Sequence, residues 1–171
     1  VVTGVTATAS TSASLVPRAE ETARLQRENA ALAQLNRGEL PDGYEVRALF
    51  EVDLRDEKQI EARIQTLVRE TEGAQTRRQE ILRSGTSTGA PPLGHPEAAR
   101  LAFLTAGLER SALRLTFLRS PASFRETLLH AEERQRSIRA AKQAAEVERL
   151  EAEQDGLRAA QARQEAIARA R

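Results

Sequence analysis

The C-terminal part of the chain constrains its fold more than any other segment. Residues 123–171 contain no proline and one glycine, Gly156, and consist largely of Ala, Glu, Arg and Gln. These residue types favour helix. A helix of about 50 residues would be about 75 Å long. No compact domain of this size needs such a rod, so we expect it to extend, to space or to pair with another helix. This favours a structural or interaction role over a catalytic pocket.

Composition points the same way. The chain has 171 residues, 3% aromatic, with four Phe, one Tyr and no Trp, Met or Cys. We therefore expect a core of Leu, Ile and Ala, as in coiled coils. The absence of Cys excludes disulfides, thiolate zinc sites and cysteine nucleophiles. The absence of Met leads us to expect a fragment or a processed product of a longer protein.

Charge argues against a nucleic-acid partner. The 26 basic and 25 acidic residues give a net charge of +1 and are interspersed along the chain. We interpret them as solvated helix surface with i,i+4 pairs such as Glu132–Arg136 and Glu165–Arg169. Nucleic-acid binders show a concentrated basic face instead.

The first 16 residues carry no charge and have three interpretations. A flexible linker is preferred. The end of a membrane helix that begins upstream, and a remnant near a signal-peptide cleavage site at Ala7-Thr8-Ala9, stay open. No stretch approaches the 20 or so apolar residues of a complete membrane span.

Two helices are expected before a linker. The first covers residues 17–37, with a heptad seam at Thr22, Leu25, Asn29, Leu32 and Asn36. Asn29 either sets register in a core or faces water. Residues 38–54 form an irregular connection anchored by Leu49 and Phe50. The second helix begins after a capping box of Asp56 and Gln59 and ends at residue 83.

Residues 84–96, rich in Gly, Ser, Thr and Pro, predict a linker that lets the second and third helices form an antiparallel hairpin. The third helix covers residues 96–119 and ends at Ser120-Pro121. Ser123 and Glu126 form a capping box that begins the last helix. The domain prediction is thus a first segment (1–16), a helical region (17–83), the linker (84–96) and a second helical region (97–171).

The expected fold is all-α: an elongated helical hairpin or bundle with coiled-coil segments and one long C-terminal helix. Leu104, Leu108 and Leu115 should be deeply buried. The apolar seams over residues 60–81 and 101–118 exceed what a slim hairpin covers, so we expect self-association. The interface and core candidates are Leu25, Leu32, Ile60, Ile64, Leu67, Ile81, Leu101, Leu104, Leu108, Leu115, Leu118, Phe124, Leu128 and Ile138.

No constellation for chemistry emerges. His95 stands in the linker, and His130 has Glu126 and Glu133 at helical spacing, which predicts a surface ion pair rather than a metal site. Residues 84–89 lack the frame of a phosphate-binding loop. We expect no catalytic residue, metal, cofactor or small-molecule ligand, and therefore no enzyme.

Two stretches carry a resemblance. Residues 113–129 (LRLTFLRSPASFRETLL) combine a Leu/Phe-rich helix end, a proline break and a Leu-Leu pair, and residues 50–67 read FEVDLRDEKQIEARIQTL. Together they resemble the extramembrane helical region of bacterial mechanosensitive channels of the small-conductance superfamily. The resemblance implies a periplasmic, bundled, non-catalytic module that continues into a membrane helix after Arg171.

The predicted function is a non-enzymatic coiled-coil oligomerisation or spacer module of a bacterial cell-envelope protein, such as the periplasmic part of a membrane channel. The alternative is a cytosolic scaffold or adaptor that binds a partner protein's helices. The expected partners are a second copy of the chain and, through flanking segments, a membrane. The location is accordingly the periplasm or cell envelope, with the cytoplasm as the alternative.

Overall fold

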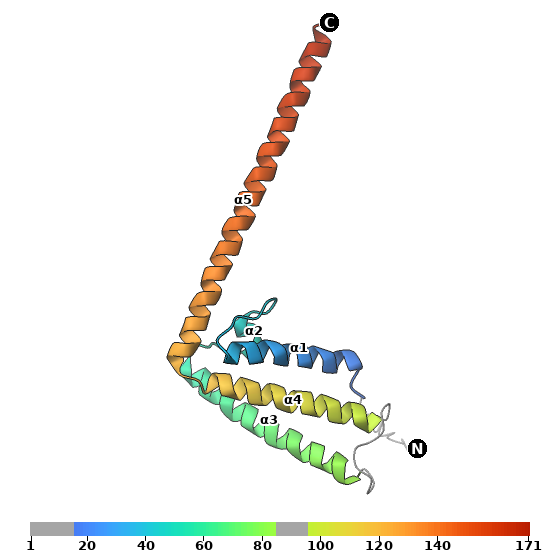
Figure 1. Ribbon diagram of the computed structural model, residues 1–171, viewed down its shortest axis with the longest axis vertical. Coiled ribbons are helices and arrows are strands. Elements are labelled where there is room, and N and C mark those ends of the chain that lie inside the picture. Colours follow the sequence, from blue (N-terminus) through green and yellow to red (C-terminus); the bar gives the residue numbers. More distant parts are fainter. Residues whose placement is uncertain (1–15, 85–95) are drawn as a thin grey trace, which may run out of the picture. The chain divides into compact units, whose positions relative to one another are not determined.

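The computed structural model describes residues 16–84 and 96–171 (Figure 1). These residues form five helices and no strand: α1 (Ala19–Asn36), α2 (Val46–Phe50), α3 (Glu57–Ser84), α4 (Pro96–Leu118) and α5 (Ala122–Arg169). The all-α class and the long C-terminal helix are confirmed. The predictions for residues 1–15 and for the linker over residues 85–95 lie outside the described part of the chain.

The chain divides into two compact units, Val1–Arg125 and Glu126–Arg171. The boundary lies inside α5, whereas the sequence placed its boundary at the linker over residues 84–96. Within the first unit α1 and α3 both pack on α4.

Helix α4 lies between α1 and α3; α1 and α4 run in the same direction, and α3 runs in the opposite direction (Figure 1). Two asparagines fix the parallel register of α1 on α4. The side-chain amide of Asn29 donates to the carbonyl of Ala106 (3.0 Å), and that of Asn36 donates to the carbonyl of Leu113 (3.1 Å). Both contacts join residues 77 positions apart, one heptad after the other.

The contact with Ala106 distinguishes between the two interpretations of Asn29, which were a position in the core and a position facing water. The residue is buried, with 3% of its surface exposed, so it does not face water. The helix that it contacts is α4 of the same chain. The expected hairpin of α3 and α4 is therefore extended by a third helix that the sequence had not paired with either.

The helix ends follow local signals. Asp56 caps α3, because its Oδ1 accepts from the backbone N–H groups of Lys58 (3.0 Å) and Gln59 (3.3 Å). After α1, Gly38 adopts a left-handed φ of 81°. Its N–H donates to the Leu35 carbonyl, as in a Schellman motif. A Cβ at Gly38 would lie 3.5 Å from the ring of Phe124, so the sharp turn also admits this close approach.

Three of the four phenylalanines gather in one cluster. The rings of Phe50 in α2 and Phe117 in α4 stack with their centroids 4.6 Å apart, and Phe124 meets Phe117 edge-on at 6.2 Å. Phe50 and Phe117 are fully buried. At this end of the bundle aromatic rings therefore add to the core of Leu, Ile and Ala that composition predicts. The anchoring roles predicted for Leu49 and Phe50 agree with their burial, although their segment is a short helix.

The core candidates fall into three groups. Buried are Leu25, Leu32, Ile60, Leu67, Leu118 and Leu128. Half-buried are Ile64, Ile81, Leu101, Leu104, Leu108, Leu115 and Phe124. Exposed is Ile138.

The prediction of deep burial at Leu104, Leu108 and Leu115 is wrong. The face of α4 that meets α1 contains Ala106 and Leu113, whose carbonyls bind the two asparagines. Leu104 is two positions from Ala106, which turns it about 200° around the helix. The leucine row therefore lies on the opposite face of α4, where it stays half-buried.

An arginine takes an interior position instead. Arg114 is 6% exposed, and its Nε has no acceptor in the described part of the chain. Burial lowers the pKa of its guanidinium, and the nearby charges of Arg110 and Arg63 lower it further. The nearby charges of Glu51 and Glu28 act in the opposite direction, so the bundle holds a buried cation whose desolvation is only partly offset.

Candidate functional site: the surface of α5

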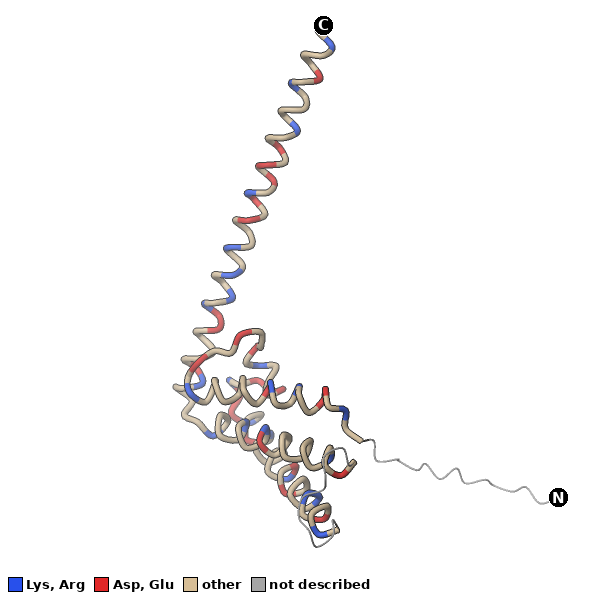
Figure 2. Tube along the Cα trace, turned by 45° about the vertical axis from the view of Figure 1, so that its right-hand side comes forward, with Lys and Arg blue, Asp and Glu red and all other residues tan. Residues whose placement is uncertain are grey.

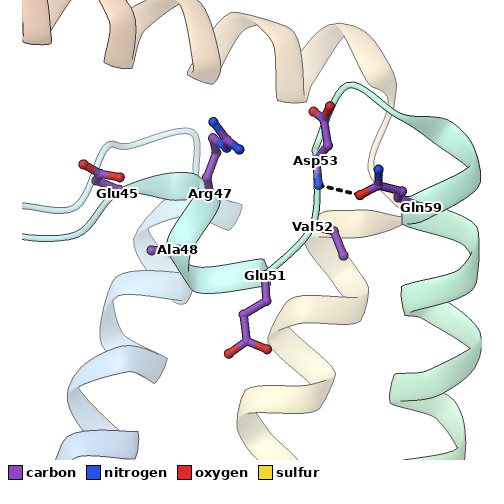
Figure 3. Close-up of a pocket in the computed structure, with 7 residues that line it drawn as sticks. All are labelled: Glu45, Arg47, Ala48, Glu51, Val52, Asp53 and Gln59. Atoms are coloured by element: carbon purple, nitrogen blue, oxygen red, sulfur yellow. Dashed lines mark hydrogen bonds between the residues drawn. The ribbon is translucent and has the colours of Figure 1, made fainter.

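We describe two hollows on the bundle, and among their described lining residues neither assembles catalytic groups. The first, about 530 Å³, lies by α2 and the start of α3. Its three carboxylates, from Glu45, Glu51 and Asp53, point in different directions (Figure 3). The one contact drawn between its residues is the hydrogen bond from the Asp53 N–H to Gln59 Oε1, at 3.1 Å. This hollow offers no convergent site for a ligand or a metal.

The second hollow, about 400 Å³, lies where the start of α4 meets the end of α3. Ile81, Phe103 and Leu104 give it an apolar floor, flanked by Arg77 and Arg100. No nucleophile stands beside a base among its lining residues. Within residues 16–84 and 96–171, no three His, Cys, Asp or Glu side chains are grouped to hold a metal ion.

Of the two histidines, His130 alone lies within the described residues. His95 lies outside the described residues. His130 is exposed on α5, where Nε2 is 3.4 Å from Glu126 and Nδ1 is 3.6 Å from Glu133. This is the surface ion pair that the sequence predicted.

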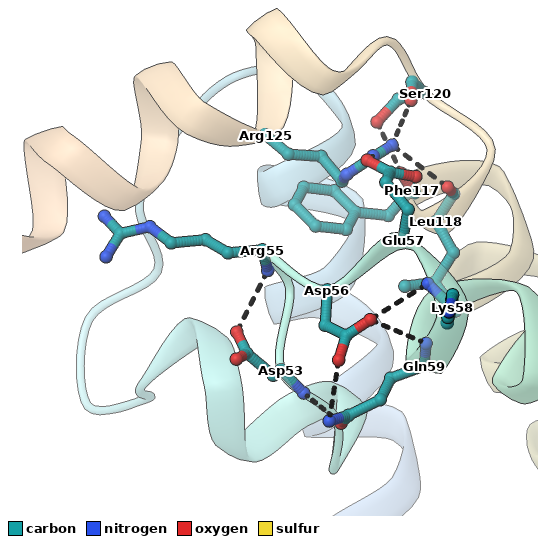
Figure 4. Close-up of polar contacts among 10 residues, drawn as sticks. All are labelled: Asp53, Arg55, Asp56, Glu57, Lys58, Gln59, Phe117, Leu118, Ser120 and Arg125. Atoms are coloured by element: carbon teal, nitrogen blue, oxygen red, sulfur yellow. Dashed lines mark hydrogen bonds and ion pairs between the residues drawn. The ribbon is translucent and has the colours of Figure 1, made fainter.

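A network of hydrogen bonds fixes the connection between α4 and α5 (Figure 4). The buried guanidinium of Arg125 donates to the carbonyls of Leu118 (3.1 Å) and Ser120, and to Glu57 on α3 (2.8 Å). The carbonyls at the end of a helix have no partner within it. Arg125 therefore satisfies the end of α4 and holds the first turn of α5 against α3. The sequence-predicted break at Ser120-Pro121 is confirmed, but the role of Arg125 was missed because its partners lie on two other elements.

Beyond this connection, α5 presents an uncovered surface. Leu128 and Leu129 are buried, but all residues from 133 to 171 are exposed. Four large apolar side chains stand on the later part of this surface: Val147, Leu150, Leu157 and Ile167, each 45–66% exposed. Buried apolar surface normally stabilises a helix more than its propensity does. A helix of this length that buries so little is suited to contact with another molecule.

Ion pairs within α5 support the helix in the absence of packing. Arg149 binds Glu146 (2.5 Å) and Glu153 (2.6 Å), one turn to either side. These hydrogen bonds lower the pKa of Glu146 and raise that of Arg149. The two pairs named from the sequence, Glu132–Arg136 (3.6 Å) and Glu165–Arg169 (3.9 Å), are also present.

Charge on α5 is grouped by segment (Figure 2). Residues 134–142 hold four basic residues and no acidic one. Residues 146–155 hold five carboxylates and one arginine, and residues 158–171 hold four arginines and one glutamate. The description of the charges as interspersed is therefore wrong for this helix. The balance over the whole chain concealed the pattern, which a count along short windows would have found.

The apolar residues of α5 do not form one continuous stripe. Ile138 and Leu150 are twelve positions apart, which places them about 120° apart around an ideal helix. Leu150, Leu157, Ala160, Gln164 and Ile167 alternate at heptad spacing and form a separate seam. We call these five residues with Glu153 the distal seam. Ile138 was expected in the core, but it is exposed and does not belong to the distal seam.

None of the described helices is long and apolar enough to cross a membrane. No protein-family model, curated protein or solved structure matches the chain. The class that the structure itself defines is an all-α protein with a helical bundle and a long, solvent-exposed C-terminal helix.

Proposed function

We propose that this chain is a non-enzymatic interaction module in which α5 pairs with another helix, and that the first such partner is a second copy of the chain. One observation carries the proposal: residues 133–171 are exposed throughout, yet they include a heptad seam with large apolar side chains. Exposure of these apolar side chains to water is unfavourable for the isolated helix, and pairing with another helix would bury them.

The self-association surface that we propose is on α5 and differs from the one expected from sequence. The seams over residues 60–81 and 101–118 belong to α3 and α4, which pack on each other, and α1 packs on α4 as well. Their apolar residues are therefore half-buried or buried within one chain. The surface that is left for a partner is on α5.

Sedimentation velocity at micromolar concentrations tests the proposal. We expect the full chain to associate, and the double variant Leu150→Ser, Leu157→Ser to sediment as a monomer. Ile138→Ser is the matched control, because Ile138 is equally exposed but lies off the distal seam. If the unsubstituted chain is monomeric at high micromolar concentration, self-association is rejected. The alternative of an adaptor that binds the helix of another protein then remains.

We further propose a bacterial cell-envelope location, in which the module spaces or oligomerises a larger membrane-associated protein. This rests on the resemblance of residues 50–67 and 113–129 to the periplasmic helices of small-conductance mechanosensitive channels. Fractionation of cells that express the parent protein tests it. Recovery in the envelope fraction is the expected result, and recovery in the cytosol would favour the scaffold alternative.

A further inference from the structure

We propose that two copies of α5 pair antiparallel, with the two-fold axis passing between Arg158 and Ala159. The inference rests on the proposed self-association and adds the orientation and register of the pair. Three observations support it: the exposure of the distal seam, the charge segments on either side of the axis, and the spacing of the apolar residues.

Charge favours the antiparallel orientation. The segment before the axis, residues 146–155, carries five carboxylates and one arginine, and the segment after it, residues 158–171, carries four arginines and one glutamate. Antiparallel pairing places the acidic segment of each copy against the basic segment of the other. In this register Glu146, which lies one turn before Leu150 on the same face, meets Arg171 of the second copy. The complementarity occurs twice, once on each side of the axis.

The apolar residues agree with the same axis. Leu150 meets Ile167 of the second copy, and Leu157 meets Ala160. In antiparallel coiled coils the two alternating seam positions face each other in this way. The small side chain of Ala160, near Gly156, allows the two backbones to approach closely at the centre. A polar layer of Glu153 and Gln164 lies between these contacts, and the glutamine amide can donate to the carboxylate.

Two other arrangements fit less well. Parallel pairing in register would place five carboxylates against five carboxylates and four arginines against four arginines. Such opposition of like charges is unfavourable in helix pairs. An antiparallel axis nearer residue 144 would set the basic segment 134–142 against 146–155, but it needs Ile138 and Leu150 on one face. These two residues lie about 120° apart.

Single cysteines test the geometry directly, because the chain contains no Cys. Leu150→Cys and Ile167→Cys are prepared as separate full-length variants, oxidised mildly alone and as a mixture, and examined by non-reducing electrophoresis. In the proposed pair, equivalent Leu150 positions are about 25 Å apart at 1.5 Å per residue. A disulfide needs Cα atoms within about 7 Å. The mixture should therefore give a cross-linked dimer, and each variant alone should give only the background of an Ala152→Cys control.

The outcomes separate the orientation from self-association itself. Cross-linking of each variant with itself, at a level similar to the mixture, would mean parallel pairing: the inference fails and the proposed function stands. A mixture at background level, with variants that still sediment as dimers, would overturn the register. A mixture at background level with monomeric variants and a monomeric parent chain would overturn both proposals.

Discussion

The bundle and the exposed part of α5 are both helical but are stabilised in different ways. In the bundle, Phe117 and Leu32 are fully buried, and Asn29 ties α1 to α4 through a buried hydrogen bond. In residues 133–171 no side chain is buried, and the polar contacts join neighbouring turns of the same helix. Helical propensity forms both regions, but only the first has tertiary contacts that hold it.

This difference shows what a heptad seam in the sequence can predict and what it cannot. A heptad seam indicates that a helix needs a partner, but it does not say whether the partner is in the same chain. For α1 the partner is α4, 77 residues away. In α5 the side chains of residues 133–171 are exposed, and we propose this surface for contact with a second molecule.

Truncation of the aromatic cluster should show the largest difference between the regions. Phe117→Ala removes a fully buried ring that contacts both Phe50 and Phe124, and should destabilise the bundle by about 3–5 kcal/mol. Ile138→Ala, on the exposed surface, should change stability by less than about 0.5 kcal/mol. Urea unfolding measures both. Equal effects would show that the cluster is not the core.

Loss of Arg125 should have the next largest effect, because it disconnects α4 from the start of α5. Arg125→Met removes the donors to Leu118, Ser120 and Glu57, and should cost about 1.5–3 kcal/mol in unfolding free energy. Arg125→Lys, which keeps the charge, should lose less. A neutral Arg125→Met variant would contradict a structural role for this network.

Replacement of the buried arginine should act in the opposite direction. Arg114→Met removes a desolvated cation and fills a similar volume, so we expect the bundle to gain about 1–3 kcal/mol in thermal or urea unfolding. Arg110→Met is the control: Arg110 is partly exposed and binds Glu28 at 3.4 Å, so its loss should give no gain. Destabilisation by Arg114→Met would mean that Arg114 has an acceptor that stabilises it.

The smallest effect is expected from pH on the exposed helix. The folded-state pKa of Glu146 is lowered by its hydrogen bond with Arg149, so this contact stabilises the helix above the unfolded pKa, about 4.3. The stabilisation is lost as the pH falls through the folded pKa. Carbon chemical shifts around Arg149 should therefore lose helical character in acid. Glu146→Gln should abolish the dependence, whereas Glu148→Gln should leave it unchanged.

Local signals in the sequence predicted most of the helices. Asp56 and Gln59 marked the start of α3, and Ser120-Pro121 marked the break before α5. These signals act within one or two turns, so they can be interpreted without knowing the fold. Boundaries predicted from them lie within a few residues of those observed.

The side-chain environment was harder to predict because it depends on contacts far along the chain. Leu108 is half-buried where deep burial was predicted, and no pattern in the sequence indicated that Arg114 is buried, since the face that α1 covers on α4 was not known. Arg125 acts through α3 and the end of α4, which no local pattern reveals. The distal seam and the grouping of charges along α5 were both present in the sequence, but the balance of charge over the whole chain concealed the grouping.

Hydrogen exchange at two protein concentrations tests the central claim that α5 is an interaction surface. At low concentration, amides around Asn29 and Phe117 should exchange slowly, and those of residues 146–168 should exchange fast. At a concentration that favours the dimer, exchange over residues 146–168 should slow markedly while the bundle stays unchanged. Fast exchange over residues 146–168 that does not depend on concentration would contradict the account.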